Sequence, residues 1–196
     1  MNRKLLPAIG VMVFGLQGCA SLAPPQKTEA VSAGERFEGG YINVTAPHSD
    51  GWEMIQSSTV GITFARSGTA ANESFIAHVM KFNLPPTNTP EDFEALIKQS
   101  VESDTDSSRL TVQQSSFSYS SERPYPCVRF HSVIQDNAPQ GKKGPLLLET
   151  DGLYCRHPEQ QESGFAIIYS HRGEQPYAAL RAEAESFVQG IQVPHR

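Results

Sequence analysis

Two cysteine-bearing segments with the composition of strands lie on either side of a loop rich in Gly, Pro and Lys, and together they limit the topology of the chain. The segments cover residues 125–135 and 146–156, and their apolar and β-branched content predicts two strands. If Cys127 faces Cys155 across antiparallel strands, paired residue numbers sum to 282, and the loop is centred on Gly141 among turn-forming residues. The two segments therefore predict a long central hairpin.

The first residues of the chain have the composition of an export signal. Arg3 and Lys4 give a positive charge, and residues 5–16 follow without a charged side chain. An apolar run of this length suits a signal peptide and is too short to remain in a bilayer as a transmembrane helix. Because exported compartments are oxidising, we expect Cys127 and Cys155 to form a disulfide.

A third cysteine follows this run directly. The sequence Leu16-Gln17-Gly18-Cys19 resembles the lipobox of bacterial lipoproteins, although a small residue is commoner than Gln17 at its position. The resemblance implies cleavage before Cys19 and attachment of palmitate-like acyl chains, and two or more chains anchor a protein stably. Ala20, where Asp often marks retention in the inner membrane, implies the periplasmic face of the outer membrane. The alternative is ordinary signal cleavage after Gly18-Cys19-Ala20.

The length of the chain suits one exported domain behind a linker. Removing the signal peptide, residues 1–18, leaves 178 of the 196 residues. Residues 19–38, with two prolines and few apolar side chains, predict a lipidated N-terminus and a flexible tether, with a short docked strand as the alternative. We expect a single domain over residues 39–196. The mature chain has 14 basic and 21 acidic residues, a balance that argues against nucleic acid as a partner.

The remaining elements follow from residue spacing. Thr89 and Pro90 predict the start of a helix that has one apolar stripe and reaches about Val101. Residues 176–189 predict a closing helix that stops at Gly190. Alternation predicts further strands over residues 41–44, 60–66, 74–84, 109–120 and 165–171.

This order of elements resembles the PsbP/Mog1-like fold from about Tyr41 to Val193. The resemblance is carried by Pro47 with Gly51-Trp52, by Gly61-Ile62-Thr63-Phe64, by the helix over residues 90–101 and by Phe187-Val188. It implies an α+β domain in which helices pack on an antiparallel sheet as an α/β/α sandwich, as in the DcrB-like group of bacterial lipoproteins. No ligand-binding position of that fold can be matched here, and a fold alone does not specify a function.

One pair of residues could support catalysis. The hairpin register sets His131 opposite Asp151, close enough for a cross-strand ion pair, and a nearby serine would complete a Ser-His-Asp arrangement. The chain contains no G-x-S-x-G motif, so we interpret the pair as structural and predict no catalytic residue.

Other candidate sites are weaker. His157 with Glu159, and His171 with Glu174, could ligate a metal, but the chain has neither H-E-x-x-H nor C-x-x-C, so we predict no metal and no cofactor. Gly141-Lys142 lacks the other residues of a phosphate-binding loop. Trp52 could line a ligand groove, but a single tryptophan is more often part of the core.

These observations predict a cell-envelope lipoprotein that is not an enzyme and that binds a partner protein or an apolar ligand in the periplasm. One alternative is an envelope hydrolase that uses His131 and Asp151. It requires a cleft with a nucleophile within hydrogen-bond reach. Another is a structural accessory subunit of an envelope complex, which a large exposed apolar patch would favour.

Overall fold

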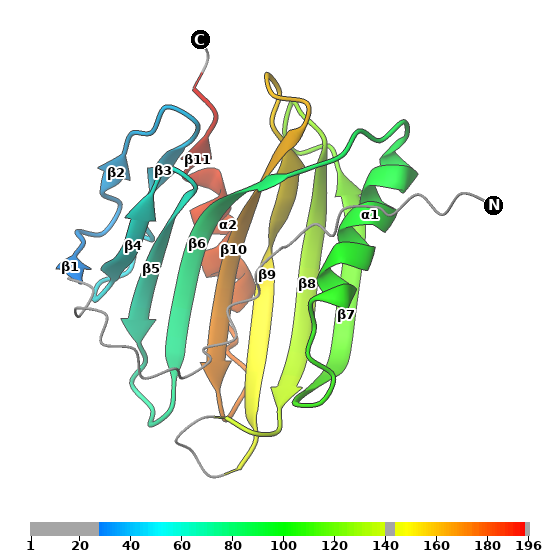
Figure 1. Cartoon of the computed structure of the whole chain (residues 1–196). Helices are drawn as coiled ribbons and strands as arrows, with labels where there is room; N and C mark the ends of the chain where they lie inside the picture. Colours follow the sequence, from blue (N-terminus) through cyan, green and yellow to red (C-terminus); the bar gives the residue numbers. More distant parts are fainter. Residues whose placement is uncertain (1–27, 140–143, 195–196) are drawn as a thin grey trace, which may run out of the picture.

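One large antiparallel sheet dominates the computed structural model, which describes residues 28–139 and 144–194 (Figure 1). Its eight strands lie in the order β1-β4-β5-β6-β10-β9-β8-β7. They are β1 (Glu29–Ala30), β4 (Glu53–Ser58), β5 (Gly61–Ser67), β6 (Ser74–Asn83), β7 (Leu110–Ser120), β8 (Cys127–Asp136), β9 (Leu146–Arg156) and β10 (Ser163–Gly173). The other described elements are a small sheet of β2 (Arg36–Phe37), β3 (Asn43–Thr45) and β11 (Ile191–Gln192), and the helices α1 (Pro90–Ser103) and α2 (Leu180–Gln189).

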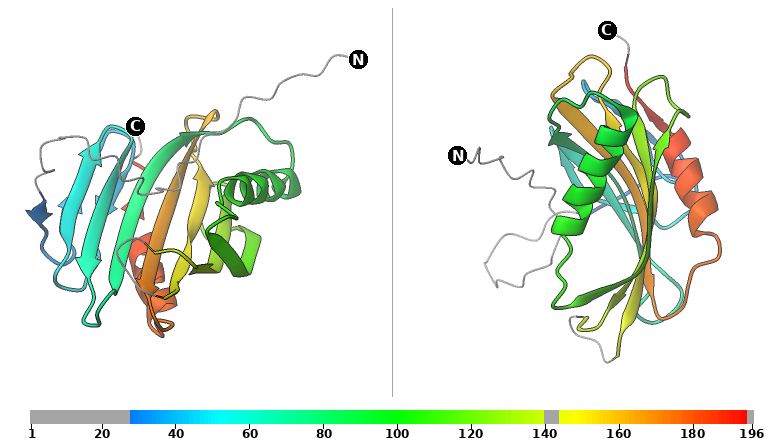
Figure 2. Two further views of the ribbon diagram at one scale, coloured as in Figure 1. Left: turned by 60° about the horizontal axis from the view of Figure 1, so that its bottom comes forward. Right: turned by 90° about the vertical axis from the view of Figure 1, so that its right-hand side faces the viewer.

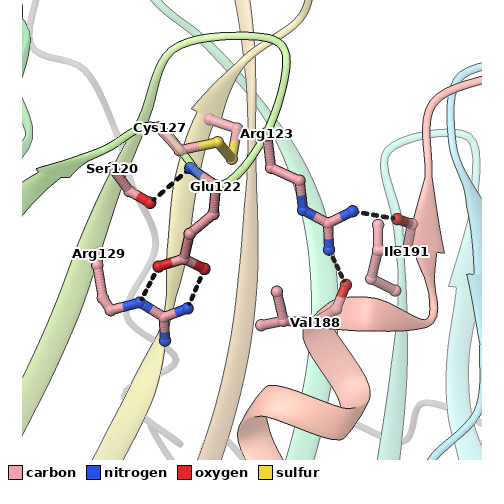
Figure 3. Close-up of a disulfide and its surroundings, with 8 residues drawn as sticks. Ser120, Glu122, Arg123, Cys127, Arg129, Val188 and Ile191 are labelled. Atoms are coloured by element: carbon pink, nitrogen blue, oxygen red, sulfur yellow. Dashed lines mark hydrogen bonds and ion pairs between the residues drawn. A yellow bond between two sulfur atoms is a disulfide. The ribbon is translucent and has the colours of Figure 1, made fainter.

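The central hairpin has the predicted register. Cys127 pairs with Cys155, and His131 pairs with Asp151, so each pair sums to 282. A disulfide joins the two cysteines, with Cα atoms 4.1 Å apart (Figure 3). The residues at the centre of the predicted loop, 140–143, which include Gly141-Lys142, lie outside the described residues.

The first helix begins at the predicted residue for the predicted reason. The Thr89 side chain accepts a hydrogen bond from the Asp92 amide at 3.1 Å, and Pro90 occupies the first turn. Phe93 and Ile97 are buried, and they pack in one cluster with side chains of β6, β8, β9 and β10. The closing helix begins later than predicted, at Leu180, whose amide bonds the Tyr177 carbonyl in a turn.

The predicted α/β/α sandwich is wrong. The described residues contain only two helices, of 14 and 10 residues, against an eight-stranded sheet whose longest strands have 11 residues. Figure 2 shows the helices on opposite sides of the sheet, where neither one covers the full width of a face. Helix α2 shares its buried cluster with residues of the small sheet, including Val44 and Ile191. The helical stripes were correctly located, but they are too short to form layers of their own.

The folded domain begins earlier than predicted. Residues 28–38 contain β1 and β2, where the sequence predicts a tether, so the predicted boundary at Gly39 is about ten residues too late. Glu29 pairs with Met54 on β4, and the Phe37 ring lies 5.5 Å from the Phe64 ring in the core. The docked-strand alternative therefore holds for this part. Residues 1–27, including the signal peptide and the lipobox with Cys19, lie outside the described residues.

Trp52 belongs to the core, as predicted. Its side chain is 2% exposed, and its indole N–H donates to the Ser49 hydroxyl at 2.9 Å. The ring meets Tyr169 edge-on with centroids 5.7 Å apart. A buried tryptophan with a satisfied N–H is the usual arrangement in a protein interior.

The buried carboxylate of Asp136, at the end of β8, connects the start of β7 with the end of β10. Asp136 is 3% exposed and accepts hydrogen bonds from Arg109 at 2.5 and 2.7 Å and from Arg172 at 2.6 Å. The bonds from Arg109 are the main cause that lowers the pKa of this carboxyl below its ordinary value. The ionised form therefore stabilises the fold above the unfolded pKa of about 3.9, and this contribution is lost as the pH falls through the lower folded pKa.

We expect Asp136→Asn to lower the free energy of unfolding by about 1–3 kcal/mol at pH 7, because two guanidinium groups lose their charged acceptor. The difference from the parent should shrink as the pH falls from the unfolded pKa of about 3.9 through the lower folded pKa of Asp136. Urea unfolding between pH 7 and pH 2.5 measures both effects. Asp50→Asn, at an exposed carboxylate, is the control and should match the parent. A penalty for Asp136→Asn that stays constant across this range would contradict the assignment.

Candidate functional site

His131 and Asp151 do meet across the hairpin. The His131 Nδ1 lies 3.5 Å from an Asp151 carboxylate oxygen, and the other oxygen of that carboxylate lies 3.3 Å from the Arg129 guanidinium. Burial raises the pKa of Asp151, while the charges of Arg129 and His131 act in the opposite direction. The pair is thus part of a larger charge network.

Arg129 connects this network to the helix beside it. Its guanidinium contacts Glu122 at 2.6 Å, in the connection before β8, and Glu185 on α2 at 2.9 Å (Figure 3 shows the Glu122 pair). Within the described residues, no hydroxyl group is hydrogen-bonded to His131, although Ser116 lies opposite it on β7. The geometry holds α2 against the sheet and supplies no nucleophile next to the histidine.

His157 with Glu159, and His171 with Glu174, are the pairs considered as metal ligands and set aside. His171 is 1% exposed, and its ring nitrogens lie 3.0 Å from Glu149 and 3.3 Å from Glu73 rather than near Glu174. The Nδ1 of His157 accepts a hydrogen bond from the Glu159 amide. Across residues 28–139 and 144–194, no cluster of three or more His, Cys, Asp or Glu side chains could hold a metal ion.

A concave feature lies elsewhere, at one end of the sheet. It is an open groove of about 610 Å³ between the segment before β4, the turn from β5 to β6, and Tyr177 in the turn before α2. Its lining includes Asp50, Glu53, Arg66 and Phe75. We call it the β5–β6 groove.

Arg66 is fixed at the base of this groove. Its guanidinium carbon lies 4.3 Å from the Phe75 ring centroid and 5.1 Å from that of Trp52, and its Nη2 lies 3.3 Å from Glu183 on α2. Such stacking on aromatic faces is favourable for a guanidinium. The positive charge of Arg66 is therefore already matched by Glu183.

Glu183 also accepts hydrogen bonds from two tyrosines. The Tyr177 hydroxyl donates at 2.7 Å, and the Tyr169 hydroxyl donates to the other carboxylate oxygen. The bond to Glu183 is the main cause that raises the pKa of Tyr177, whereas burial is the main cause for Tyr169. Both phenols stay protonated at neutral pH and keep this wall of the groove in one arrangement.

The turn from β5 to β6 is held by a carboxylate. Glu73 accepts hydrogen bonds from the amides of Thr69 at 2.8 Å and Ala70 at 3.2 Å, and its second oxygen faces the buried His171. The bond from Ala70 is the main cause that lowers the pKa of Glu73. These contacts of Glu73 hold the turn in one conformation, and the turn forms one rim of the groove.

The remaining charges of the groove are negative. Asp50 and Glu53 are exposed, and neither side chain has a hydrogen-bond or ion-pair partner in the part of the chain that the structure describes. Arg66 and Glu73 are both bonded to neighbouring residues of the chain. The unpaired carboxylates of Asp50 and Glu53 therefore determine the net charge of the groove surface. The groove thus favours a partner that brings positive charge or hydrogen-bond donors.

Sequence reasoning missed this groove. Its residues come from separate segments, and the contact between Arg66 and Glu183 spans 117 residues. The only local signal was Gly51-Trp52, where Gly51 has a φ of +85° that favours glycine. The other residues of the groove belong to no recognisable motif.

A second cavity lies beneath α1 and is apolar. Its lining includes Leu84, Leu96, Val101 and Tyr154, but it has room for only about 10 Å³. A space of this size is at most about that needed by one water molecule. The cavity cannot hold an acyl chain or another apolar ligand of ordinary size.

Among the described helices, none is long and apolar enough to cross a membrane.

Comparison with known proteins gives only distant similarities. No protein-family model and no curated protein matches the chain. Among solved structures, it is similar to a Bacteroides thetaiotaomicron protein at 12% identity and a TM-score of 0.46, over 83% of this chain and 49% of that chain. The chain thus spans about half the length of that protein.

Two further similar structures are Mog1 proteins, the group named in the sequence resemblance. The Ran-binding protein Mog1p of Saccharomyces cerevisiae is 10% identical, with a TM-score of 0.45, over 86% of this chain and 96% of that chain. A Mog1 point mutant is 12% identical, with a TM-score of 0.45, over 85% of this chain and 96% of that chain. Similarity at this level carries no conclusion about the partners of this chain.

Proposed function

We propose that this chain is a non-enzymatic lipoprotein of the bacterial cell envelope, anchored through Cys19, whose domain binds a partner protein in the β5–β6 groove. The anchor rests on Leu16-Gln17-Gly18-Cys19 and on the export signal before it. The groove carries the binding part of the proposal, because it is open, has a rigid aromatic and arginine base, and presents two unpaired carboxylates.

The chemistry of the groove favours a protein over an apolar ligand. Asp50 and Glu53 would be left unpaired and desolvated by an apolar molecule, and burial of an unpaired charge is costly. A protein segment with Lys or Arg side chains satisfies both carboxylates. The cavity beneath α1, at about 10 Å³, offers an apolar ligand no alternative place. The hydrolase alternative lacks support, because no hydroxyl group is hydrogen-bonded to His131 within the described residues.

We expect a photo-crosslinking side chain at Ser67 to capture a protein in intact cells. Ser67 is exposed and lines the groove at the end of β5, so a bound partner must pass close to it. The measurement is a shift to higher mass on a blot of the full chain, followed by mass spectrometry of the product. Adding Asp50→Asn and Glu53→Gln should reduce the yield several-fold, because the groove then loses its negative charge.

The matched control is the same probe at Ser57, an exposed serine on β4 that does not line the groove. It should give little of the Ser67 product. Equal products from the two positions, or no protein product at Ser67, would contradict binding in the groove.

A further inference from the structure

Strand β7 forms the long free edge of the sheet. It has 11 residues and pairs only with β8, whereas the strand at the opposite edge, β1, has two residues (Figure 1). A free edge presents backbone N–H and C=O groups that can pair with another strand. The two edges therefore differ greatly in what they offer to a second chain.

A hydrogen bond near the end of β7 shows which of its residues face outward. The Tyr119 amide donates to Glu94 on α1 at 2.8 Å and so points away from β8. Backbone groups of alternate residues point the same way in an antiparallel strand, so Phe117 and Ser115 also face outward. A bulge between Val112 and Gln114 interrupts the alternation beyond this stretch. Ser115 and Phe117 form the central part of the open edge.

The side chains of β7 lack the usual protection of a free edge. Its sequence, LTVQQSSFSYS, contains no charged residue and no proline, so the protection present is the bulge between Val112 and Gln114 and the contact of α1 at Tyr119. Two of the three large apolar side chains that are most exposed among the described residues, Val112 at 48% and Tyr119 at 40%, also lie on this strand. An added strand would cover both.

We propose that β7 pairs with β7 of a second copy of this chain, in antiparallel orientation, to form a two-fold symmetric dimer with one continuous sheet. Alignment about a two-fold axis at the centre of the strand pairs residues whose numbers sum to 230 and places Ser115 opposite Ser115 of the other copy, while the Tyr119 amide keeps its bond to Glu94 and stays outside the shared ladder. The bulge shifts the pairing by one residue further out. The central pair at Ser115 is unaffected.

The absence of charge is what favours a second copy as the occupant. Self-pairing across a two-fold axis places each residue near its own counterpart, so a charged residue near the axis would meet a like charge. Strand β7 carries no charge, and the acid bonded to its outward-facing backbone, Glu94, lies beside Tyr119 at one end. The two copies of Glu94 therefore lie at opposite ends of the joined strands.

A peptide of another protein is the less favoured occupant. Recognition of a particular peptide at a sheet edge relies on pockets for alternate side chains. Neither the β5–β6 groove nor the cavity beneath α1 is lined by any residue of β7. Backbone pairing of an uncharged strand suits a self-complementary contact. This dimer does not depend on the anchor or on the groove.

The test is co-purification of two differently tagged copies of the full chain, expressed together. The parent copies should co-purify. Ser115→Lys in both copies, or Ser115→Glu in both, should reduce the recovered partner by about fivefold or more, because like charges face each other at the axis. Ser115→Lys in one copy with Ser115→Glu in the other should restore it. Ser115 is exposed, so its replacement leaves the core intact, and recovery in the mixed pair shows that both variants fold.

The controls are Ser57→Lys and Ser57→Glu on β4, which should leave co-purification at the parent level. Failure of the parent copies to co-purify would overturn the proposal. An unchanged recovery of the partner copy in the like-charged pairs would also overturn the proposal. An equal loss of recovery in the mixed pair would overturn it as well, because it points to a peptide or another protein at this edge.

Discussion

Reduction of the Cys127–Cys155 disulfide is expected to lower the free energy of unfolding by about 3–4 kcal/mol. The bond closes a loop with a sequence separation of 28 residues, and the chain-entropy model assigns this stabilisation to a loop of that size. In a chain of this length, each kcal/mol shifts the melting temperature by about 2–4 °C. We therefore expect the melting temperature to fall by roughly 6–16 °C.

The surroundings of the bond explain why the fold itself should survive reduction. Both cysteines are fully buried and lie in paired strands, so the hairpin keeps its backbone ladder. The connection just before Cys127 carries Arg123, which donates to the carbonyl of Val188 on α2 at 2.5 Å and to that of Ile191 on β11 at 3.3 Å (Figure 3). These bonds hold the connection to the helix without the disulfide.

The measurement is thermal and urea unfolding with and without reductant, together with far-ultraviolet circular dichroism at room temperature. Mass spectrometry of the unreduced, protease-digested chain identifies the Cys127–Cys155 pair directly. The control is Cys127→Ala with Cys155→Ala, whose stability should not respond to reductant. A melting temperature of the parent that is unchanged by reduction, or two free thiols in the unreduced chain, would contradict the prediction.

Cys19→Ser is expected to abolish lipidation and to leave an uncut precursor. The proposed anchor is a set of acyl chains whose first attachment needs the Cys19 thiol, and serine offers no thiol. Since two or more chains give stable membrane binding and one gives only marginal binding, the mature, membrane-extracted form should be lost completely. The readouts are incorporation of labelled palmitate, the size of the product on a blot, and detergent extraction of membranes.

Ser21→Ala, two residues after the cysteine, is the matched control and should be lipidated and processed like the parent. If Cys19→Ser is still cut to the mature size and remains in the membrane fraction, the anchor proposal is wrong. Ordinary signal cleavage would then be favoured if the product has the mature size but is recovered without lipid.

Local patterns predicted the elements of this domain well. The strand over residues 146–156 and the cap at Thr89 agree with the structure, because alternation and capping depend on neighbouring residues. The pairing of His131 with Asp151 was also predictable, since one cysteine pair sets the register of the whole hairpin. The fold class was not predictable in this way, because the extent of each layer depends on how the elements pack.

The candidate site was less predictable than the elements. His131 and Asp151 meet as expected, but Arg129 also binds Asp151, and it links the strands to Glu185 on a helix 56 residues further along the chain. No periodicity signals such a contact. The β5–β6 groove was missed for the same reason.

The sequence by itself determined β3 and the strands from β5 to β10, the central register and the start of the first helix. Each depends on residue spacing within one segment or one hairpin. Only the tertiary structure decided that residues 29–37 dock on the sheets, that Arg66 meets Glu183, and that β7 is a free edge. These features depend on which surfaces meet when distant segments bury their apolar side chains, and burial of apolar area is not directional enough for a local pattern to specify its partner.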